Sequence, residues 1–254
     1  MPSPSTNRLT ALAAGAAAGA FAGAAAAQTA TSGAPSFSFG AGASSDYVYR
    51  GASRTEGRGQ GFASAAAGFS DAYAGVWASN VALRGAGGTL SAAEVDVYGG
   101  WRPEVMGYSL DLGAQYDAFT GQPAGAALDY GEVYAKVSRS VGPVTGRLGL
   151  HYSPAYADHA GQAWYGEAGA DYAFARDWTV SAGAGYQTIE HRQAALGPSE
   201  PALAIAGDYA TWNAGVTRAV GDHLAVDLRY FDTDHHGYGP GFGSKLVGQI
   251  RASF

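Results

Sequence analysis

Apolar and polar side chains alternate at every second position along most of this chain. In the last segment, residues 244–254, Leu246 and Phe254 share one side of an extended backbone, and Lys245 and Arg251 lie on the other. Successive side chains of a β-strand point to opposite faces, so this segment is predicted to be a strand with one apolar and one charged face. A soluble sheet could use the same alternation. Its repetition along the chain and the terminal phenylalanine favour a membrane β-barrel, with lipid outside and water within.

The same alternation predicts about twelve strands, an even number, as single-chain bacterial barrels have. They span residues 36–50, 60–70, 73–83, 93–102, 108–119, 130–139, 144–152, 164–174, 178–189, 208–218, 223–232 and 244–254. In the third of these, Tyr73, Trp77 and Val81 are predicted to face lipid. The predicted fold class is all-β, a single transmembrane antiparallel up-and-down β-barrel.

The connections between these strands alternate in length. The short turns are residues 70–72, 103–107, 140–143, 175–177 and 219–221, and they are rich in Gly, Pro and Asp. The longer connections are residues 51–59, 84–92, 120–129, 153–163, 190–207 and 233–243. Short turns at one end and long loops at the other are typical of outer-membrane barrels, whose termini both lie on the periplasmic, short-turn side.

Aromatic residues gather near the predicted strand ends. Such residues form girdles at the two surfaces of a membrane, where an apolar ring with a polar edge is stable. The predicted girdle consists of Tyr47, Tyr73, Trp77, Trp101, Tyr108, Trp164, Trp178, Trp212 and Phe254.

The composition excludes several other classes of protein. The 254 residues include 39 Gly and 16 Tyr, only 14% are charged, and Leu, Ile and Met are scarce, so a close-packed aliphatic core is hard to build. The formal charge of −6 argues against nucleic acid as a partner, because such binding depends on Lys and Arg neutralising phosphates. The absence of Cys excludes disulfides and thiol-based metal or redox sites.

Residues 1–27 have the features of a secretory signal peptide. Arg8 is followed by an apolar stretch, and three alanines precede Gln28 at a small-residue cleavage site. The alternative, a transmembrane anchor, usually needs roughly 20 apolar residues that are less rich in Ala and Gly. The predicted organisation is a signal peptide (1–27), a short N-terminal linker (28–35) and a barrel (36–254), and the predicted location is the outer membrane of a Gram-negative bacterium.

Three phrases in the first half of the chain resemble a known family. Residues 45–53 read SDYVYRGAS, residues 73–81 read YAGVWASNV, and residues 94–100 read EVDVYGG. In this order they resemble the TorF family of porin-like barrels. The resemblance implies an outer-membrane barrel with a pore function and indicates no substrate. The chain departs from the family in its long Gly/Ala-rich loops at 120–129 and 190–207.

Charged residues on the predicted lumen faces are the best candidates for function. Opposed acids and bases in a pore create a transverse field that selects solutes by charge and size. The candidate pore-lining residues are Asp46, Arg50, Glu94, Asp96, Arg102, Asp111, Asp117, Glu132, Lys136, Arg147, His151, Glu167, Asp171, Asp227 and Arg229. Acids outnumber bases in this set, which favours a weak preference for cations. The alternative is that salt bridges and tyrosines fill a narrow lumen that conducts nothing.

Arg50, Arg54 and Arg58 recur at the first long loop. Such a cluster could contact lipid phosphate or an anionic solute. It could also belong to a solvated loop without any ligand, which we consider the better interpretation.

Two further groups of polar residues could carry chemistry. Asp232, Asp234, His235 and His236 offer carboxylate and imidazole ligands, but they lie in a predicted exterior loop without a defined metal-binding spacing. We therefore predict no metal site.

His151 with Ser153 and Asp158 could suggest a hydrolase within the barrel wall. Ser153 precedes a proline in a predicted turn, and no oxyanion motif is visible. We therefore expect no enzymatic activity and no cofactor.

The sequence thus predicts a channel for passive diffusion of small hydrophilic solutes or ions. The alternative is a non-conducting structural or surface-interaction barrel whose long loops bind a partner. The predicted partners are outer-membrane lipid, small hydrophilic solutes and the barrel-assembly machinery, which would recognise the C-terminal strand, and the barrel is predicted to be a monomer.

Overall fold

The computed structural model describes residues 34–85, 88–157, 160–190 and 207–254. The predicted signal peptide and most of the linker lie outside the described residues. Within the described ranges the regular structure is β, apart from two short 3-10 helices, η1 (His236–Tyr238) and η2 (Pro240–Phe242). Among these residues no helix is long and apolar enough to span a bilayer.

Twelve long strands in the described part of the chain form one closed antiparallel barrel, which confirms the predicted fold class. They are β1 (Ser36–Ser44), β4 (Gln60–Phe69), β5 (Ala72–Gly85), β6 (Gly88–Trp101), β8 (Tyr108–Phe119), β9 (Tyr130–Val141), β10 (Val144–Tyr156), β11 (Gly161–Ala175), β12 (Trp178–Ile189), β13 (Tyr209–Val220), β14 (Leu224–Thr233) and β15 (Lys245–Ser253). Each strand pairs with its neighbours in chain order, and the short strand β7 (Glu104–Val105) extends the edge of β8.

The barrel closes where the last strand pairs with the first. Gly40 lies opposite Ser253 and Ser44 lies opposite Gln249 in an antiparallel register. Beyond the register, Phe39 and Phe254 exchange two backbone hydrogen bonds of 2.9 Å. Among the described strands no edge of the wall is therefore left open, which lipid requires because it offers no hydrogen-bond partner to a bare strand.

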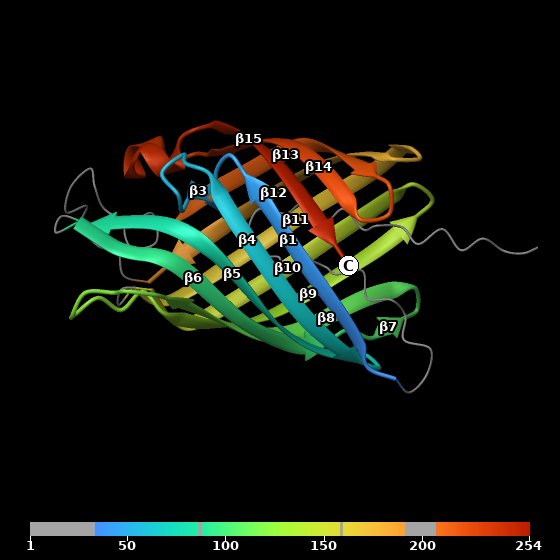
Figure 1. Cartoon of the computed structure of the whole chain (residues 1–254), viewed down its shortest axis with the longest axis horizontal. Helices are drawn as coiled ribbons and strands as arrows, with labels where there is room; N and C mark the ends of the chain where they lie inside the picture. The colour runs from blue at the N-terminus through green and yellow to red at the C-terminus, as the bar shows by residue number, and fades with distance from the viewer. Residues whose placement is uncertain (1–33, 86–87, 158–159, 191–206) are drawn as a thin grey trace, which may run out of the picture.

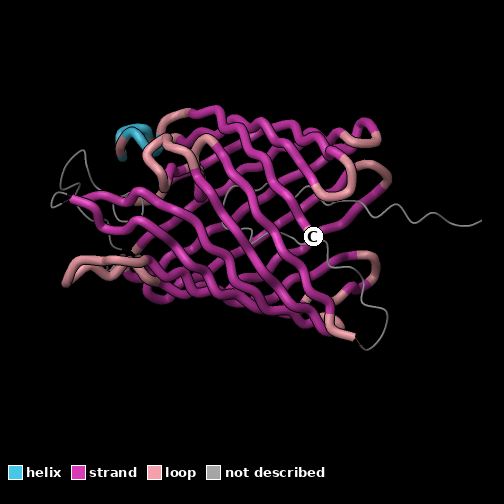
Figure 2. The backbone as a smooth tube through the Cα atoms, viewed as in Figure 1, coloured by secondary structure: helices cyan, strands magenta, loops and turns pink. Residues whose placement is uncertain are grey.

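The two ends of the barrel differ (Figures 1 and 2). One end, here called the turn end, carries tight turns such as Met106–Gly107, both residues having positive φ, together with Ser36 and Phe254 at the chain termini of the wall. The other, here called the loop end, carries η1, η2 and the longer connections.

Two connections at the loop end are shorter than predicted. β5 and β6 continue as a paired hairpin through most of residues 84–92, with Arg84 opposite Thr89. β10 runs on to Tyr156, which pairs with Gly161 at the start of β11. Cross-strand hydrogen bonds beyond the apolar band extend these hairpins, and the alternation of side chains alone does not reveal them.

The first strand ends earlier than predicted. β1 stops at Ser44, and residues 45–59, here called the plug segment, turn into the barrel instead of continuing the wall to residue 50. Two-residue strands β2 (Val48–Tyr49) and β3 (Ala52–Ser53) pair within this segment as a small hairpin. The hairpin is buried throughout.

The predicted orientation of the third strand is wrong. Trp77 on β5 is 6% exposed and lies inside the barrel, whereas its neighbour Val76 is 45% exposed on the outer wall. The Trp77 ring packs against Tyr47 of the plug segment, with ring centroids 5.4 Å apart. An apolar plug requires apolar contacts on the lumen side of the wall, and here these outweigh the usual rule that apolar side chains face lipid.

Lipid-dependent quenching of tryptophan fluorescence should separate the two sides of the wall. In variants that retain a single tryptophan, brominated acyl chains should quench Trp212, which is 40% exposed on the outer wall, several-fold more than Trp77. Equal quenching of both residues would show that Trp77 faces lipid.

Candidate functional site: the plugged lumen

A tight turn brings the plug segment into the lumen. Arg50 and Gly51 join β2 to β3 with φ values of 48° and 82°. Positive φ at both central residues is the type I′ geometry of two-residue hairpins, which glycine adopts without strain. A Cβ on Gly51 would also collide with Thr211 on the wall. The non-glycine residue Arg50 accepts an uncommon conformation here because its side chain is fixed by the contacts described below.

Side-chain hydrogen bonds hold the plug segment in shape. The Asp46 carboxylate accepts hydrogen bonds from Ser53 Oγ at 2.6 Å and Thr55 Oγ1 at 2.7 Å. Thr55 Oγ1 in turn accepts a hydrogen bond from the backbone N–H of Tyr47 at 2.9 Å. Asp46 therefore stabilises the plug itself and is not available to a solute.

Arg50 fixes the tip of the plug to the opposite wall. Its guanidinium donates to Glu132 Oε2 on β9 at 2.7 Å and to Gln187 Oε1 on β12 at 3.0 Å. It also lies over the ring of Tyr165, 4.4 Å from the centroid. Arg50 is only 2% exposed, so these contacts replace its hydration.

Arg54 makes the second attachment. Its guanidinium forms a buried salt bridge with Glu94 on β6 and donates to Tyr130 Oη at 2.8 Å. The ring of Tyr49 covers it, with the centroid 3.6 Å away. Cation–π contact and a charge-assisted hydrogen bond thus act on the same group.

The solvated interpretation of the arginine cluster is wrong for two of its three members. Arg50 and Arg54 are buried ion-pair partners inside the barrel. Arg58 alone lies at the surface, where its side chain is 53% exposed and contacts Glu56 at 2.5 Å.

Apolar packing surrounds these ion pairs at the loop end. Tyr47, Tyr49 and Ala52 of the plug join a buried cluster contributed by the wall and by the other loops. The remaining members are Trp77, Val81, Leu83, Phe119, Leu128, Tyr130, Tyr156, Ala157, Ala160, Ala163, Ile189, Tyr209 and Phe242. The plug is therefore packed as part of a small core, not merely laid across an open mouth.

Nearer the turn end, pairs of opposite charge line the lumen. Arg102 contacts Asp111 at 2.9 Å, and Arg147 forms a salt bridge with Asp171. Tyr73 Oη donates to Asp111 at 2.6 Å, so Tyr73 also faces the lumen.

A third pair is tied to several strands. Arg229 contacts Asp227 at 3.1 Å and donates to Ser181 Oγ at 2.7 Å and Asn213 Oδ1 at 2.8 Å. It joins β14 to β12 and β13 across the interior face of the wall.

His151 lies between two acids. Its ring nitrogens are 3.6 Å from Glu132 and 3.5 Å from Glu167. Within the described ranges, Ser153 Oγ has no hydrogen-bond partner, so no hydrogen bond joins it to His151. Asp158, the third residue of the possible hydrolase, lies outside the described residues. The expectation that this chain is not an enzyme stays a prediction.

The candidate pore-lining residues are all buried or partly buried, and those on the wall lie on its inner face. Arg54, Lys245 and Arg251 are further cations inside the barrel that the candidate set lacks. Lys245 Nζ donates to the backbone oxygens of Gly51 at 2.9 Å and Gly241 at 2.7 Å. The alternation of the final segment already placed Lys245 and Arg251 opposite its apolar face, so that signal could have found them. With these cations included, acids and bases nearly balance, which removes most of the basis for a cation preference.

The histidine-rich loop forms separate pairs. His236 Nε2 is 2.7 Å from Asp232 Oδ1, and His235 Nδ1 is 2.7 Å from Asp234 Oδ1. Each imidazole therefore contacts a different carboxylate, and the four side chains form two pairs.

Three of the predicted girdle aromatics lie inside the barrel. Tyr47 and Trp77 belong to the buried cluster, and Tyr73 bonds to Asp111. The rings of Tyr47 and Trp77 pack in the cluster around the plug, and the hydroxyl of Tyr73 makes a hydrogen bond in the lumen. The other members are exposed on the outer wall: Trp101, Tyr108, Trp164, Trp178, Trp212 and Phe254.

A closed wall, an outer surface of apolar side chains and an interior of ion pairs define the class of membrane β-barrels. Residues 27–242 match the model of a family described as "Bacterial protein of unknown function (Gcw_chp)", and the chain belongs to this family. No curated protein matches the sequence. The resemblance to TorF porins stays a prediction.

Two solved porin structures are similar to this chain. One, of the NanC porin, is 12% identical, covers 86% of this chain and 99% of its own, and has a TM-score of 0.57. Another, described as "KdgM porin in complex with disordered oligogalacturonate", is 9% identical, covers 87% and 96% of the two chains and has a TM-score of 0.48. At this identity the NanC likeness concerns the fold alone.

Proposed function

We propose that this chain is an outer-membrane channel for passive diffusion of small hydrophilic solutes or ions, narrowed at its loop end by the plug segment. The observation that carries the proposal is the charged interior of a closed, outwardly apolar barrel. Pairs such as Arg102–Asp111 and Arg229–Asp227 keep the lumen polar toward the turn end. Opposed charges of this kind favour small polar solutes and disfavour apolar ones.

The same proposal includes the cellular context. Residues 1–27 direct export, the turn end faces the periplasm, and the barrel-assembly machinery recognises the C-terminal strand that ends in Phe254. The closed wall supports a monomer, because no strand edge is left for a second copy to pair with.

Planar-bilayer recording tests the channel. Ser44 and Gln60 lie directly opposite each other at the ends of β1 and β4, so a linker of about four Gly and Ser residues can replace residues 46–58 without disturbing the wall. We expect small, ohmic conductance steps from the wild type and several-fold larger steps from the variant without the plug. Arg58→Ala is the control, and its conductance should equal that of the wild type.

A non-conducting barrel is the second candidate, and one observation favours it. The plug contributes Tyr47, Tyr49 and Ala52 to a packed apolar cluster at the loop end. If the wild type gives no conductance steps and the variant without the plug does, this second candidate is supported. If neither protein gives conductance steps, the channel proposal is overturned.

A further inference from the structure

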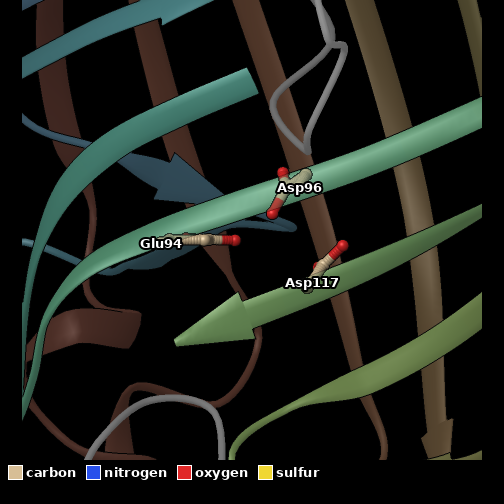
Figure 3. Close-up of side chains that lie close together, drawn as sticks. All are labelled: Glu94, Asp96 and Asp117. Carbon is tan, nitrogen blue, oxygen red and sulfur yellow. The ribbon is translucent and has the colours of Figure 1, made fainter. Parts of the chain in front are cut away.

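Three carboxylates converge on the lumen side of two neighbouring strands (Figure 3). Glu94 and Asp96 lie on β6, and Asp117 lies on β8 directly opposite Asp96 in the antiparallel register. One oxygen from each of the three side chains lies within 4.8 Å of the other two. The alternation of the strands places all three on the inner face.

Most of the oxygens in this trio have no donor. Both oxygens of Asp96, Oε2 of Glu94 and Oδ2 of Asp117 are buried and accept no hydrogen bond from the residues that the structure describes. Asp96 is the decisive member, since it is 2% exposed and neither oxygen of its carboxylate has a hydrogen-bond partner in the described part of the chain. Arg54 and Tyr47 donate to the other oxygen of Glu94, and Gln115 donates to the other oxygen of Asp117.

The local charge is also unbalanced. The three carboxylates together carry three negative charges when ionised, and Arg54 supplies a single positive charge. Buried charge without a partner is strongly unfavourable, because the group loses its hydration and gains nothing in return. Two further positive charges would balance the group.

We propose that Glu94, Asp96 and Asp117 bind one divalent cation of the calcium type in the lumen, beside the attachment of the plug. Ca²⁺ binds oxygen ligands at about 2.3–2.6 Å, so two oxygens on opposite sides of the ion are about 4.6–5.2 Å apart. The oxygens of the trio are close enough together to share one such ion. Mg²⁺ demands near-octahedral geometry at about 2.0–2.1 Å and gives up its water reluctantly, so it should bind more weakly to three buried carboxylates. The site does not depend on whether the barrel conducts.

Calcium binding to the full-length protein tests the proposal. The protein is purified in detergent, stripped with chelator and titrated with Ca²⁺ by calorimetry, with Mg²⁺ as comparison. We expect a site that Asp96→Asn weakens at least tenfold and that Asp96→Asn combined with Asp117→Asn abolishes. Asp177→Asn makes the same chemical change in the turn between β11 and β12 and should leave the titration unchanged.

Thermal unfolding supplies a second readout, first on the wild type alone and then on the Asp96→Asn variant. Ligand that binds only the folded state raises its stability, so Ca²⁺ should raise the Tm of the wild type. In chelator, Asp96→Asn should unfold at a higher temperature than the wild type, because it removes an unbalanced buried charge. In excess Ca²⁺ this order should reverse. Absence of both calcium heat and a calcium-dependent Tm in the wild type would overturn the site and leave shared protons as the means of neutralising the trio.

Discussion

Arg54→Met is expected to release the plug segment from the wall while the barrel stays folded. The side chain of Arg54 is almost fully buried, and Glu94 has no other cation within the described contacts. Removing one partner of a buried ion pair costs about 3–5 kcal/mol, because the other charge is left in a poorly hydrated place. Since about 1.4 kcal/mol is a factor of ten in an equilibrium constant, the undocked state should become at least about 100-fold more populated.

Trypsin provides the measurement. Arg50 is buried in the docked plug, so cleavage after it requires release of the segment. The initial rate of this cleavage, followed by mass spectrometry, should rise steeply in Arg54→Met. Arg58→Met, at an exposed position of the same segment, should not change it. The double variant Arg54→Met with Glu94→Gln should restore most of the protection, and unchanged cleavage after Arg50 in the single variant would contradict the attachment.

Arg229→Met should cost a similar free energy, but it should destabilise the barrel wall and not the docking of the plug. Arg229 is buried and bonds to groups on β12, β13 and β14. Without it, Asp227 keeps, among the described residues, the hydrogen bond from Thr217 Oγ1 at 2.6 Å and the Coulombic attraction of Arg251. The free energy of unfolding of the barrel should fall by about 3–5 kcal/mol. Urea titration in lipid vesicles measures it, and cleavage after Arg50 should stay slow because the plug attachment is intact.

The partner substitution identifies the cause. Asp227→Asn removes the buried charge that Arg229→Met leaves without its arginine partner. The double variant should therefore recover more than half of the lost free energy of unfolding. A double variant as unstable as the single one would show that packing by the arginine, and not charge, is what the wall needs.

The wall of the barrel could be predicted from the sequence. The predicted segments 108–119 and 178–189 coincide with β8 and β12, and the final strand has the predicted faces. This works because each residue of the wall has a simple environment, either lipid or lumen, and period-two alternation records it directly. The lumen faces of Glu94, Glu132 and Arg229 follow from the same rule.

The plug could not be predicted in this way. Residues 45–50 continue the alternation of β1, so Tyr47 and Tyr49 resemble strand residues, and only tertiary contacts remove them from the wall. The wrong orientation predicted for Trp77 has the same cause, since Trp77 packs against the plug and not against lipid. The sequence does mark the two segments involved, because 45–53 and 94–100 are two of the family-like phrases. It does not show that they meet. Arg54, one residue beyond the first phrase, forms a salt bridge with Glu94 in the second, and no local pattern reveals a contact between residues so far apart in the chain.

The attachments of the plug have a consequence for how the molecule assembles. Arg50 bonds to Glu132 and Gln187, Arg54 bonds to Glu94, and the backbone of Gly51 accepts a hydrogen bond from Lys245, a separation of 194 residues along the chain. These partners come from strands around most of the circumference, including the last one to be synthesised. Contacts of such high sequence separation form late, because the intervening chain must be ordered first. The hairpin that is made near the beginning of the chain therefore completes its contacts only when the last strand is in place.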